Sequence, residues 1–130
     1  MSYDILIVDD APNIVLSLEF LMKKEGFTVR TASDGEASLK AISEKIPDLI
    51  LLDVMMPKKN GYEVCEAVRA NNAWKNIQII MLTAKGRDVE REKGLALGAD
   101  DYVTKPFATK ELVAKVQEIL QGRTPLHSPE

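Results

Sequence analysis

Cysteine is nearly absent from this sequence. Cys65 is the single cysteine, so the chain cannot close an internal disulfide. The first residues, Met-Ser-Tyr-Asp, also lack the basic segment and the apolar core of a secretion signal. Together these two absences predict a cytoplasmic protein. Because Cys65 falls between Val64 and Val68 in a predicted helix, we expect a packing residue and not a redox or catalytic thiol.

Long apolar runs and an excess of positive charge are missing as well. No apolar stretch approaches the roughly 20 residues of a membrane-spanning helix, so no membrane segment is expected. Lys and Arg total 17 against 20 Asp and Glu, and the resulting net charge of −3 gives no electrostatic reason for direct nucleic-acid binding. The only histidine, His127, lies in a C-terminal stretch without periodicity, where a metal-ligand role is not expected.

What is present fits one globular domain. The chain has 130 residues, of which 45% are hydrophobic and 28% are charged, and this is enough to build a core without metals or disulfides. We expect the domain to span residues 1–122. Residues 123–130 contain two prolines and are expected to form a flexible tail or the start of a linker.

Short apolar runs alternate with helical patterns along the chain. The apolar runs predict strands at residues 5–8, 27–32, 49–53, 77–82 and 101–104. A helical pattern follows each run, the third over residues 62–70, the fourth over 87–97 and the last ending at Gly122. Such alternation requires right-handed crossovers and a parallel sheet with helices on both faces. The predicted fold is therefore α/β, a flavodoxin-like doubly wound (βα)5 arrangement with strand order 2-1-3-4-5.

Two of these helices carry specific expectations. Ser33 and Glu36 have the spacing of a capping box and are expected to open the second helix. The fourth helix has few apolar residues, and those expected to face inward are Val89, Leu95, Ala96 and Leu97. With so few inward residues, this helix should be loosely held and largely exposed.

The run from Leu49 to Leu52 has no polar alternation and ends in one carboxylate, Asp53. Such a run is typical of a strand covered on both faces, and Asp53 then lies at the carboxyl edge of the sheet, where open α/β sheets bind ligands. Taken alone, this stretch fits a solvated strand-end aspartate at least as well. The strand at residues 5–8 also ends in acids, Asp9 and Asp10. In the predicted strand order, all three carboxylates converge on one crevice.

Three carboxylates at one edge repel each other, by ~4 kcal/mol per pair at about 4 Å and an effective dielectric near 20. A hard divalent ion, Mg²⁺ or Mn²⁺, suits such oxygen ligands, and no His or Cys lies beside these acids to favour zinc or iron. A metal there also lets a carboxylate attack a phosphoryl group. Thr83 and Lys105, at the ends of the fourth and fifth predicted strands, can each donate a hydrogen bond to phosphoryl oxygens.

The chain resembles the receiver domain of two-component response regulators, of the chemotaxis-type single-domain kind, from about Tyr3 to Gln121. The matching residues, in order, are Asp9-Asp10, the Asp53 of Asp-Leu-Ile-Leu-Leu-Asp-Val-Met-Met-Pro, Gly61, Thr83-Ala84, Gly98-Ala99-Asp100-Asp101-Tyr102 and Lys105-Pro106-Phe107. Each motif is weak by itself. All of them in order at these spacings make the resemblance highly specific.

The resemblance implies that Asp53 accepts a phosphoryl group from a phosphohistidine of a sensor histidine kinase or phosphotransfer protein. It implies a Mg²⁺ held by Asp10, Asp53 and the backbone carbonyl of Met55, with Asp9 acting mainly through water. Lys105 would pair with the phosphoryl group, and Thr83 would donate a hydrogen bond to it. Such a domain catalyses its own phosphorylation and a slow autodephosphorylation, which makes it a signalling domain and not an enzyme.

The resemblance also implies a switch. Tyr102 would turn inward when Thr83 moves, and the face formed by the fourth helix, fifth strand and fifth helix would then signal to a downstream effector protein or domain. Dimerisation on activation is compatible with this scheme. In the family the peptide bond of the Lys-Pro motif is typically cis, which makes Lys105–Pro106 a candidate cis peptide.

Two other classes of function remain open from the residues. One is a metal-dependent phosphohydrolase with an aspartyl nucleophile, although the chain has no room for the cap that such enzymes usually need. The other is an interaction module that works without phosphorylation. Turnover of a phosphate ester would favour the hydrolase, and the absence of any Mg²⁺-dependent modification would favour the interaction module.

Overall fold

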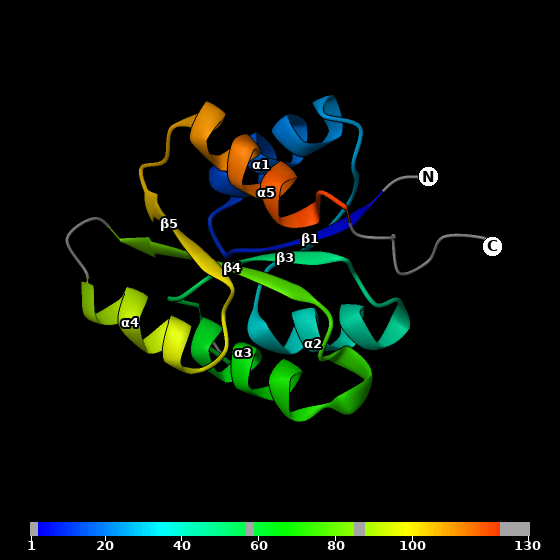
Figure 1. Cartoon of the computed structure of the whole chain (residues 1–130), viewed down its shortest axis with the longest axis vertical. Coiled ribbons are helices and arrows are strands. Elements are labelled where there is room, and N and C mark those ends of the chain that lie inside the picture. Colours follow the sequence, from blue (N-terminus) through cyan, green and yellow to red (C-terminus); the bar gives the residue numbers. More distant parts are fainter. Residues whose placement is uncertain (1–2, 57–58, 85–87, 123–130) are drawn as a thin grey trace.

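The computed structural model describes residues 3–56, 59–84 and 88–122, and its centre is a five-stranded sheet (Figure 1). The strands are β1 (Asp4–Val8), β2 (Thr28–Ala32), β3 (Leu49–Asp53), β4 (Gln78–Ala84) and β5 (Asp101–Lys105). All pairs are parallel, and the order is β2-β1-β3-β4-β5. This confirms the predicted fold and strand order, and it places β2 at an edge.

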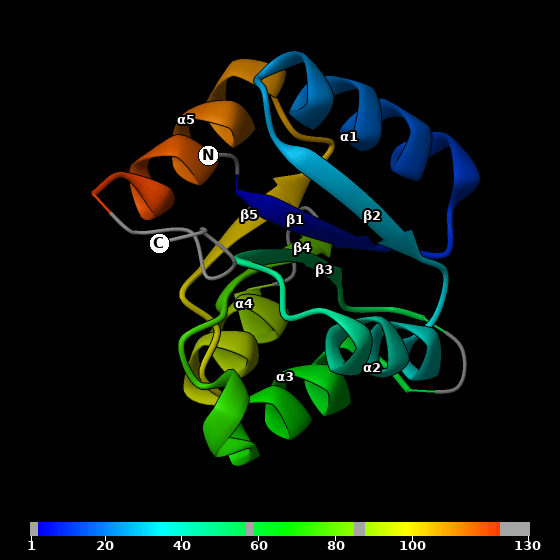
Figure 2. The same ribbon diagram turned by 90° about the vertical axis from the view of Figure 1, so that its right-hand side faces the viewer.

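Helices cover both faces of the sheet. They are α1 (Pro12–Lys24), α2 (Gly35–Glu44), α3 (Gly61–Ala70), the short 3-10 helix η1 (Asn72–Trp74), α4 (Asp88–Ala96) and α5 (Thr109–Leu120). Figure 1 and Figure 2 show α1 and α5 together on one face and α2, α3 and α4 on the other. Across the described ranges, no helix combines the length and apolarity that crossing a membrane requires. The predicted tail, residues 123–130 with His127, lies outside the described residues.

The apolar runs of the strands supply two separate cores because side chains alternate between the sheet faces. In β3, Ile50 and Leu52 pack with the face of α2 and α3, whereas Leu49 and Leu51 pack with the face of α1 and α5. Every residue of β1 and β3 is buried. This double burial explains why these strands show continuous apolar runs instead of alternation, and it makes β3 a rigid mount for its last residue, Asp53.

The expected capping box of the second helix is wrong by one residue. The N-cap of α2 is Asp34, whose side chain accepts a hydrogen bond of 2.7 Å from the Ala37 backbone N–H. Asp34 has the extended backbone that a cap needs, and its carboxylate also interacts favourably with the positive end of the helix. A reciprocal capping box occurs instead at α3, between Asn60 and Glu63.

The fourth helix is exposed as predicted, but three of the four residues assigned to its inner side, Val89, Leu95 and Ala96, were wrong. Val89 is 76% exposed, and Leu95 and Ala96 are also exposed. Only Leu97, just after the helix, packs partly against the core, and Gly94 is buried. The lysine at position 93 lies over the Tyr62 ring of α3, 4.5 Å from its centroid. Contacts at Lys93, Gly94 and Leu97 therefore join the carboxyl end of this helix to the domain.

Cys65 is a core residue, as expected. It is fully buried in α3, and its Sγ donates a weak hydrogen bond of 3.6 Å to the Leu97 carbonyl oxygen. Burial raises the pKa of the Cys65 thiol to about 11. We therefore expect native protein at neutral pH to resist alkylation by iodoacetamide, while urea-unfolded protein reacts fully, as measured by intact mass. Rapid alkylation of the native protein would contradict this burial.

Candidate functional site

Three carboxylates meet where β1 and β3 end. The two strands pair in parallel with Val8 opposite Leu52, so the residues that follow, Asp9 and Asp53, end at the same edge. One carboxylate oxygen from each of Asp9, Asp10 and Asp53 lies within 4.8 Å of the others. Asp9 and Asp53 are buried, whereas Asp10 is exposed. The structure therefore brings together the three acids that the sequence predicted to converge.

Backbone contacts fix Asp9 in place. Its N–H donates to the Ala32 carbonyl at the end of β2, at 3.2 Å, and its Oδ1 accepts from the Ala11 N–H at 2.9 Å. Pro12 then occupies the first turn of α1, where its missing N–H costs nothing. The turn from β1 into α1 thus aims Asp9 inward and leaves Asp10 at the solvent side of the crevice.

Lys105 is the positive member of the site. It ends β5 and reaches across β4, and its Nζ donates to Asp9 Oδ2 at 2.9 Å and to Asp53 Oδ1 at 3.0 Å. The following peptide bond, Lys105–Pro106, is cis, as predicted. Lys105 supplies one positive charge against three carboxylates, so the cluster keeps an excess of negative charge when all three are ionised.

The charges of the site shift each other's protonation. Burial raises the pKa of Asp53, and the neighbouring carboxylate of Asp9 raises it further, while the hydrogen bond from Lys105 opposes both. Burial by itself lowers the pKa of Lys105, but its hydrogen bonds and charge interactions with Asp9 and Asp53 outweigh burial, so the net shift is upward. The hydrogen bonds between Lys105 and the two acids therefore favour the charged form of Lys105 and the ionised form of Asp53, against the effect of burial.

A glycine allows α3 to start directly beneath Asp53. The Gly61 N–H donates to the Val54 carbonyl oxygen at 2.9 Å, and a Cβ at Gly61 would collide with the backbone carbonyl oxygen of Asp53 and come within 2.9 Å of the Val54 Cα. Only a residue without a side chain fits between these backbone atoms. The sequence marked Gly61 by family resemblance, but this steric reason is visible only in the folded chain.

Thr83 and Met55 lie at the same edge of the sheet, but unlike Lys105 they are not joined to the acids by the hydrogen bonds of the described residues. Thr83 is buried near the end of β4, next to the strand of Asp53, and it pairs with Thr104 of β5. Among the hydrogen bonds of the described residues, none links the Thr83 hydroxyl to the three acids. Met55 follows β3 by two residues, and its side chain is 69% exposed. Its backbone carbonyl remains a predicted metal ligand.

Tyr102 lies apart from the acids. It pairs with Met81 in the sheet, and basic side chains from two helices flank its ring. The guanidinium of Arg91 in α4 lies 5.1 Å from the ring centroid, and the ammonium of Lys115 in α5 lies 5.7 Å from it. Neither basic residue could be predicted from the sequence, because nothing in the charged pattern of α4 or α5 distinguishes them from their neighbours.

The donor set fits a hard divalent cation. The groups offered by Asp9, Asp10 and Asp53 are all carboxylate oxygens, the ligands that Mg²⁺ and Mn²⁺ prefer. A divalent cation would also offset the negative charge that Lys105 leaves uncompensated. The residues present therefore fit the ion that the sequence implied.

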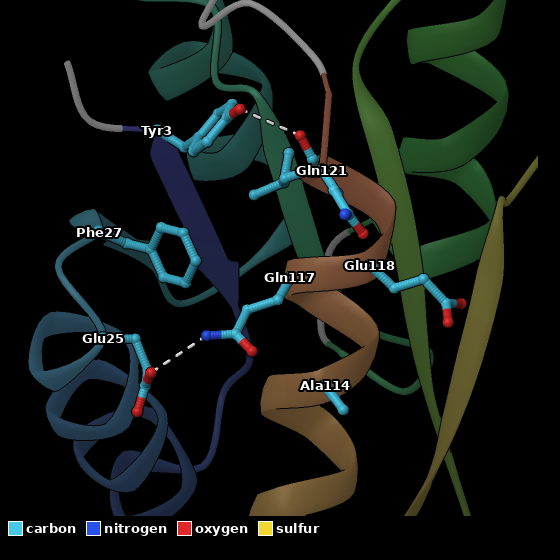
Figure 3. A pocket seen from close by; sticks show the side chains of 8 residues that line it. Tyr3, Glu25, Phe27, Ala114, Gln117, Glu118 and Gln121 are labelled. Atoms are coloured by element: carbon cyan, nitrogen blue, oxygen red, sulfur yellow. Dashed lines mark hydrogen bonds between the residues drawn. The ribbon is translucent and has the colours of Figure 1, made fainter.

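Of two hollows in the surface, one borders the acids and the other lies away from them. One of about 420 Å³ borders Asp9 and Asp10 and extends along α1 past Val15, Leu16 and Glu19, so it opens directly on the acids. Another, of about 510 Å³, lies at the opposite edge of the sheet between Tyr3, Phe27 and α5 (Figure 3). It adjoins the amino ends of β1 and β2, far from the converging carboxylates, so it is not part of this site.

Comparison with known proteins gives one consistent result. A family model described as response regulator receiver domain matches residues 5–117. The chain is 38% identical to a putative response regulator from Chloroflexus aurantiacus J-10-fl, with a TM-score of 0.90, covering 92% of this chain and 98% of the other. It is 32% identical to the chemotaxis protein CheY4 of Vibrio cholerae, with a TM-score of 0.86 and coverages of 92% and 100%. It is 29% identical to the receiver domain of a signal transduction histidine kinase from Syntrophus aciditrophicus, with a TM-score of 0.87 and coverages of 98% and 98%.

Proposed function

The chain belongs to the response regulator receiver domain family, and from this premise we propose that Asp53 accepts a phosphoryl group from a phosphohistidine of a sensor histidine kinase or phosphotransfer protein. The observation that carries the proposal is the convergence of Asp9, Asp10, Asp53 and Lys105 from three different strand ends. A single strand-end aspartate is common. A buried aspartate joined to a lysine and two further acids is an arrangement suited to phosphoryl chemistry.

The chemistry follows from the position of each group. A carboxylate oxygen of Asp53 attacks phosphorus, the new P–O bond forms, and the P–N bond to the donor imidazole breaks. Lys105 already donates to Asp53 Oδ1 at 3.0 Å, so its ammonium is placed to accompany the phosphoryl oxygens. Thr83, buried on the neighbouring strand, would donate a hydrogen bond from its hydroxyl group to one of those oxygens after a small movement.

Asp10, Asp53 and the backbone carbonyl of Met55 would hold a Mg²⁺ or Mn²⁺ ion, with Asp9 acting through water. When bound, the ion supplies the positive charge that lets a carboxylate approach a negatively charged phosphoryl group. Asp9 would keep its hydrogen bonds to the Ala11 N–H and to Lys105. This chain's own residues therefore both hold the ion and orient the nucleophile.

The phosphodonor would approach along α1. Leu16 and Phe20, one turn apart on α1, are 64% and 71% exposed, and Leu16 also borders the hollow that opens on Asp9 and Asp10. Exposed apolar side chains beside a reactive site fit a protein partner better than a small substrate. This surface supports a protein phosphodonor and gives no support to a phosphate-ester hydrolase.

The output would pass through the surface of α4, β5 and α5 to a downstream effector protein or domain. The exposed α4 and the half-buried Tyr102 support this proposal, because Val89 and Leu95 of α4 are exposed and a weakly anchored helix responds readily to a local change. Related receiver domains occur in a chemotaxis protein and in a histidine kinase. An effector of this chain would therefore be identified by its binding to the surface of α4, β5 and α5.

The proposal is tested with acetyl phosphate and purified protein. Intact mass spectrometry should show one phosphoryl group per chain in the presence of Mg²⁺ and none after chelation with EDTA. Continuous release of phosphate far beyond one equivalent, at a rate typical of enzymes, would support the hydrolase instead. Absence of labelling at every Mg²⁺ concentration would support an interaction module that works without phosphorylation.

Thr83→Ala is expected to permit phosphorylation but to weaken its effect on Tyr102. One hydrogen bond is worth about 1 kcal/mol, so the labelling rate should fall by about fivefold or less. The backbone amide shifts of α4 and β5 on phosphorylation should shrink much more, because they depend on Thr83 moving. Thr28→Ala, an exposed threonine at the other end of the sheet, is the control. A full response of α4 and β5 in Thr83→Ala would contradict this switch.

A further inference from the structure

The ring of Tyr102 is gripped by basic side chains from both neighbouring helices. Arg91 of α4 lies over the ring at 5.1 Å and donates from its guanidinium to the Tyr102 hydroxyl oxygen at 3.3 Å. Lys115 of α5 lies 5.7 Å from the ring centroid. Figure 1 shows β5 running between these two helices. Tyr102 is thus held at the surface of α4, β5 and α5 by contacts to its ring and to its hydroxyl group.

The two cations are not equivalent. Lys115 also pairs with Asp101, at 3.3 Å from Oδ2, and lies farther from the Tyr102 ring than Arg91 does. Arg91 is nearer to the ring and is the residue that bonds the hydroxyl group. A planar guanidinium also stacks on an aromatic face better than an ammonium does. Arg91 therefore contributes the more specific part of the grip.

The sheet register indicates a second position for the Tyr102 ring, beside Thr83. Met81 pairs with Tyr102, and Thr83 pairs with Thr104, so all four side chains lie on the same face of the sheet. Thr83 is two residues nearer to the acids than Met81 on the same strand. If Thr83 moved toward a phosphoryl group on Asp53, space beside it would open for the tyrosine ring. Arg91 cannot keep both of its contacts with Tyr102 after such a turn.

We propose that Arg91 is a positioning residue that holds Tyr102 in the resting position and thereby opposes the phosphorylated state. The inference rests on the proposed function of Asp53 and adds a regulator specific to this chain. The coupling is reciprocal, because the contact that restrains Tyr102 also restrains the exposed α4. Release of the ring by phosphorylation therefore frees α4, and removal of the Arg91 contact favours phosphorylation.

The expected change in the labelling rate follows from the strength of the contact between Arg91 and Tyr102. A cation–π contact at a partly exposed site changes an equilibrium by about twofold to fivefold. Arg91→Gln should therefore raise the rate of labelling by acetyl phosphate by about twofold to fivefold. Arg91→Lys keeps a cation but loses the planar stack, so its rate should lie between those of the wild type and Arg91→Gln. Lys93→Gln, which removes the cation over Tyr62 on the same helix, is the matched control and should leave the rate unchanged.

The position of the ring is measured separately from phosphorylation. Protein labelled with 3-fluorotyrosine has three fluorine signals to assign, for Tyr3, Tyr62 and Tyr102, by single Tyr-to-Phe variants. Without any phosphodonor, Arg91→Gln should move the Tyr102 signal and leave the Tyr3 signal in place. Lys93→Gln should move only the Tyr62 signal. An unchanged Tyr102 signal in Arg91→Gln would overturn the proposal whatever the chemistry of Asp53.

A double-variant comparison distinguishes two effects of Arg91→Gln, namely loss of the contact with Tyr102 and a general destabilisation of α4. In a Tyr102→Ala background, Arg91→Gln should no longer change the labelling rate, because the contact is already gone. An equal acceleration in that background would overturn the proposal. If the wild type is not labelled at all, the proposed function of Asp53 fails, and the fluorine signals still decide whether Arg91 holds the ring.

Discussion

Asp53→Asn is expected to abolish labelling by acetyl phosphate and to leave the fold intact. The nucleophile must be a carboxylate oxygen at the carboxyl edge of the sheet, and an amide cannot form a stable acyl phosphate. Asp9 does not substitute for it, because Asp9 is 1% exposed and already accepts from the Ala11 N–H and from Lys105. Loss of labelling should therefore be complete within the sensitivity of intact mass spectrometry.

The same substitution should not lower stability. Burial raises the pKa of Asp53. At neutral pH the ionised carboxylate is therefore less stable in the folded state than in the unfolded state. For a carboxyl group whose pKa is raised by folding, this loss of stability begins as the pH rises through the pKa of the unfolded state, and it persists at neutral pH. Asparagine has no charge and avoids this loss. The free energy of unfolding of Asp53→Asn at pH 7 should thus equal or exceed that of the wild type in urea titrations.

The control for Asp53→Asn is Asp34→Asn, the same chemical change outside the acid cluster. Asparagine caps a helix about as well as aspartate, so α2 should keep its N-cap bond to the Ala37 N–H. Asp34→Asn should be labelled like the wild type. Full labelling of Asp53→Asn would show that another residue is the phosphoacceptor, and it would remove the basis of the proposed function.

Gly61→Ala is expected to have the second largest effect, on stability and on the site together. The added Cβ would meet the Asp53 carbonyl oxygen and the Val54 Cα, which are backbone atoms that cannot rotate away. Overpacking of this kind costs about 1–3 kcal/mol, and a contact with backbone belongs at the upper end. Any relief requires the end of β3 to shift, so the folded variant should also be phosphorylated more slowly.

Urea denaturation and the initial labelling rate measure these two effects. Gly94→Ala is the matched control, because Gly94 is also helical and its nearest neighbour is the flexible Met81 side chain, 3.0 Å from the added Cβ. Alanine is favoured over glycine in a helix by about 1 kcal/mol, so Gly94→Ala should be close to neutral or slightly stabilising. A Gly61→Ala protein as stable and as fast as Gly94→Ala would show that the close approach at Asp53 is unimportant.

Local sequence signals failed where several residues competed for one role. Ser33 and Asp34 both suit a helix cap, and it is Asp34 whose side chain accepts the cap hydrogen bond from the Ala37 N–H in the folded chain. The inward side of α4 was misassigned for a related reason. Its apolar residues are too few to define a stripe, and the helix is oriented instead by contacts such as Lys93 over Tyr62. Side-chain chemistry alone does not rank such alternatives.

By itself, the sequence determined the fold, the strand order and the edge at which the acids meet. Continuous apolar runs that alternate with helical patterns are typical of a parallel sheet covered on both faces, and the runs of β1 and β3 end in the acids that they carry to the carboxyl edge. Only the tertiary structure decided how Lys105 bridges Asp9 and Asp53, why Gly61 must lack a side chain and which basic residues grip Tyr102. These contacts join residues far apart in the chain, and they depend on distances that no local pattern encodes.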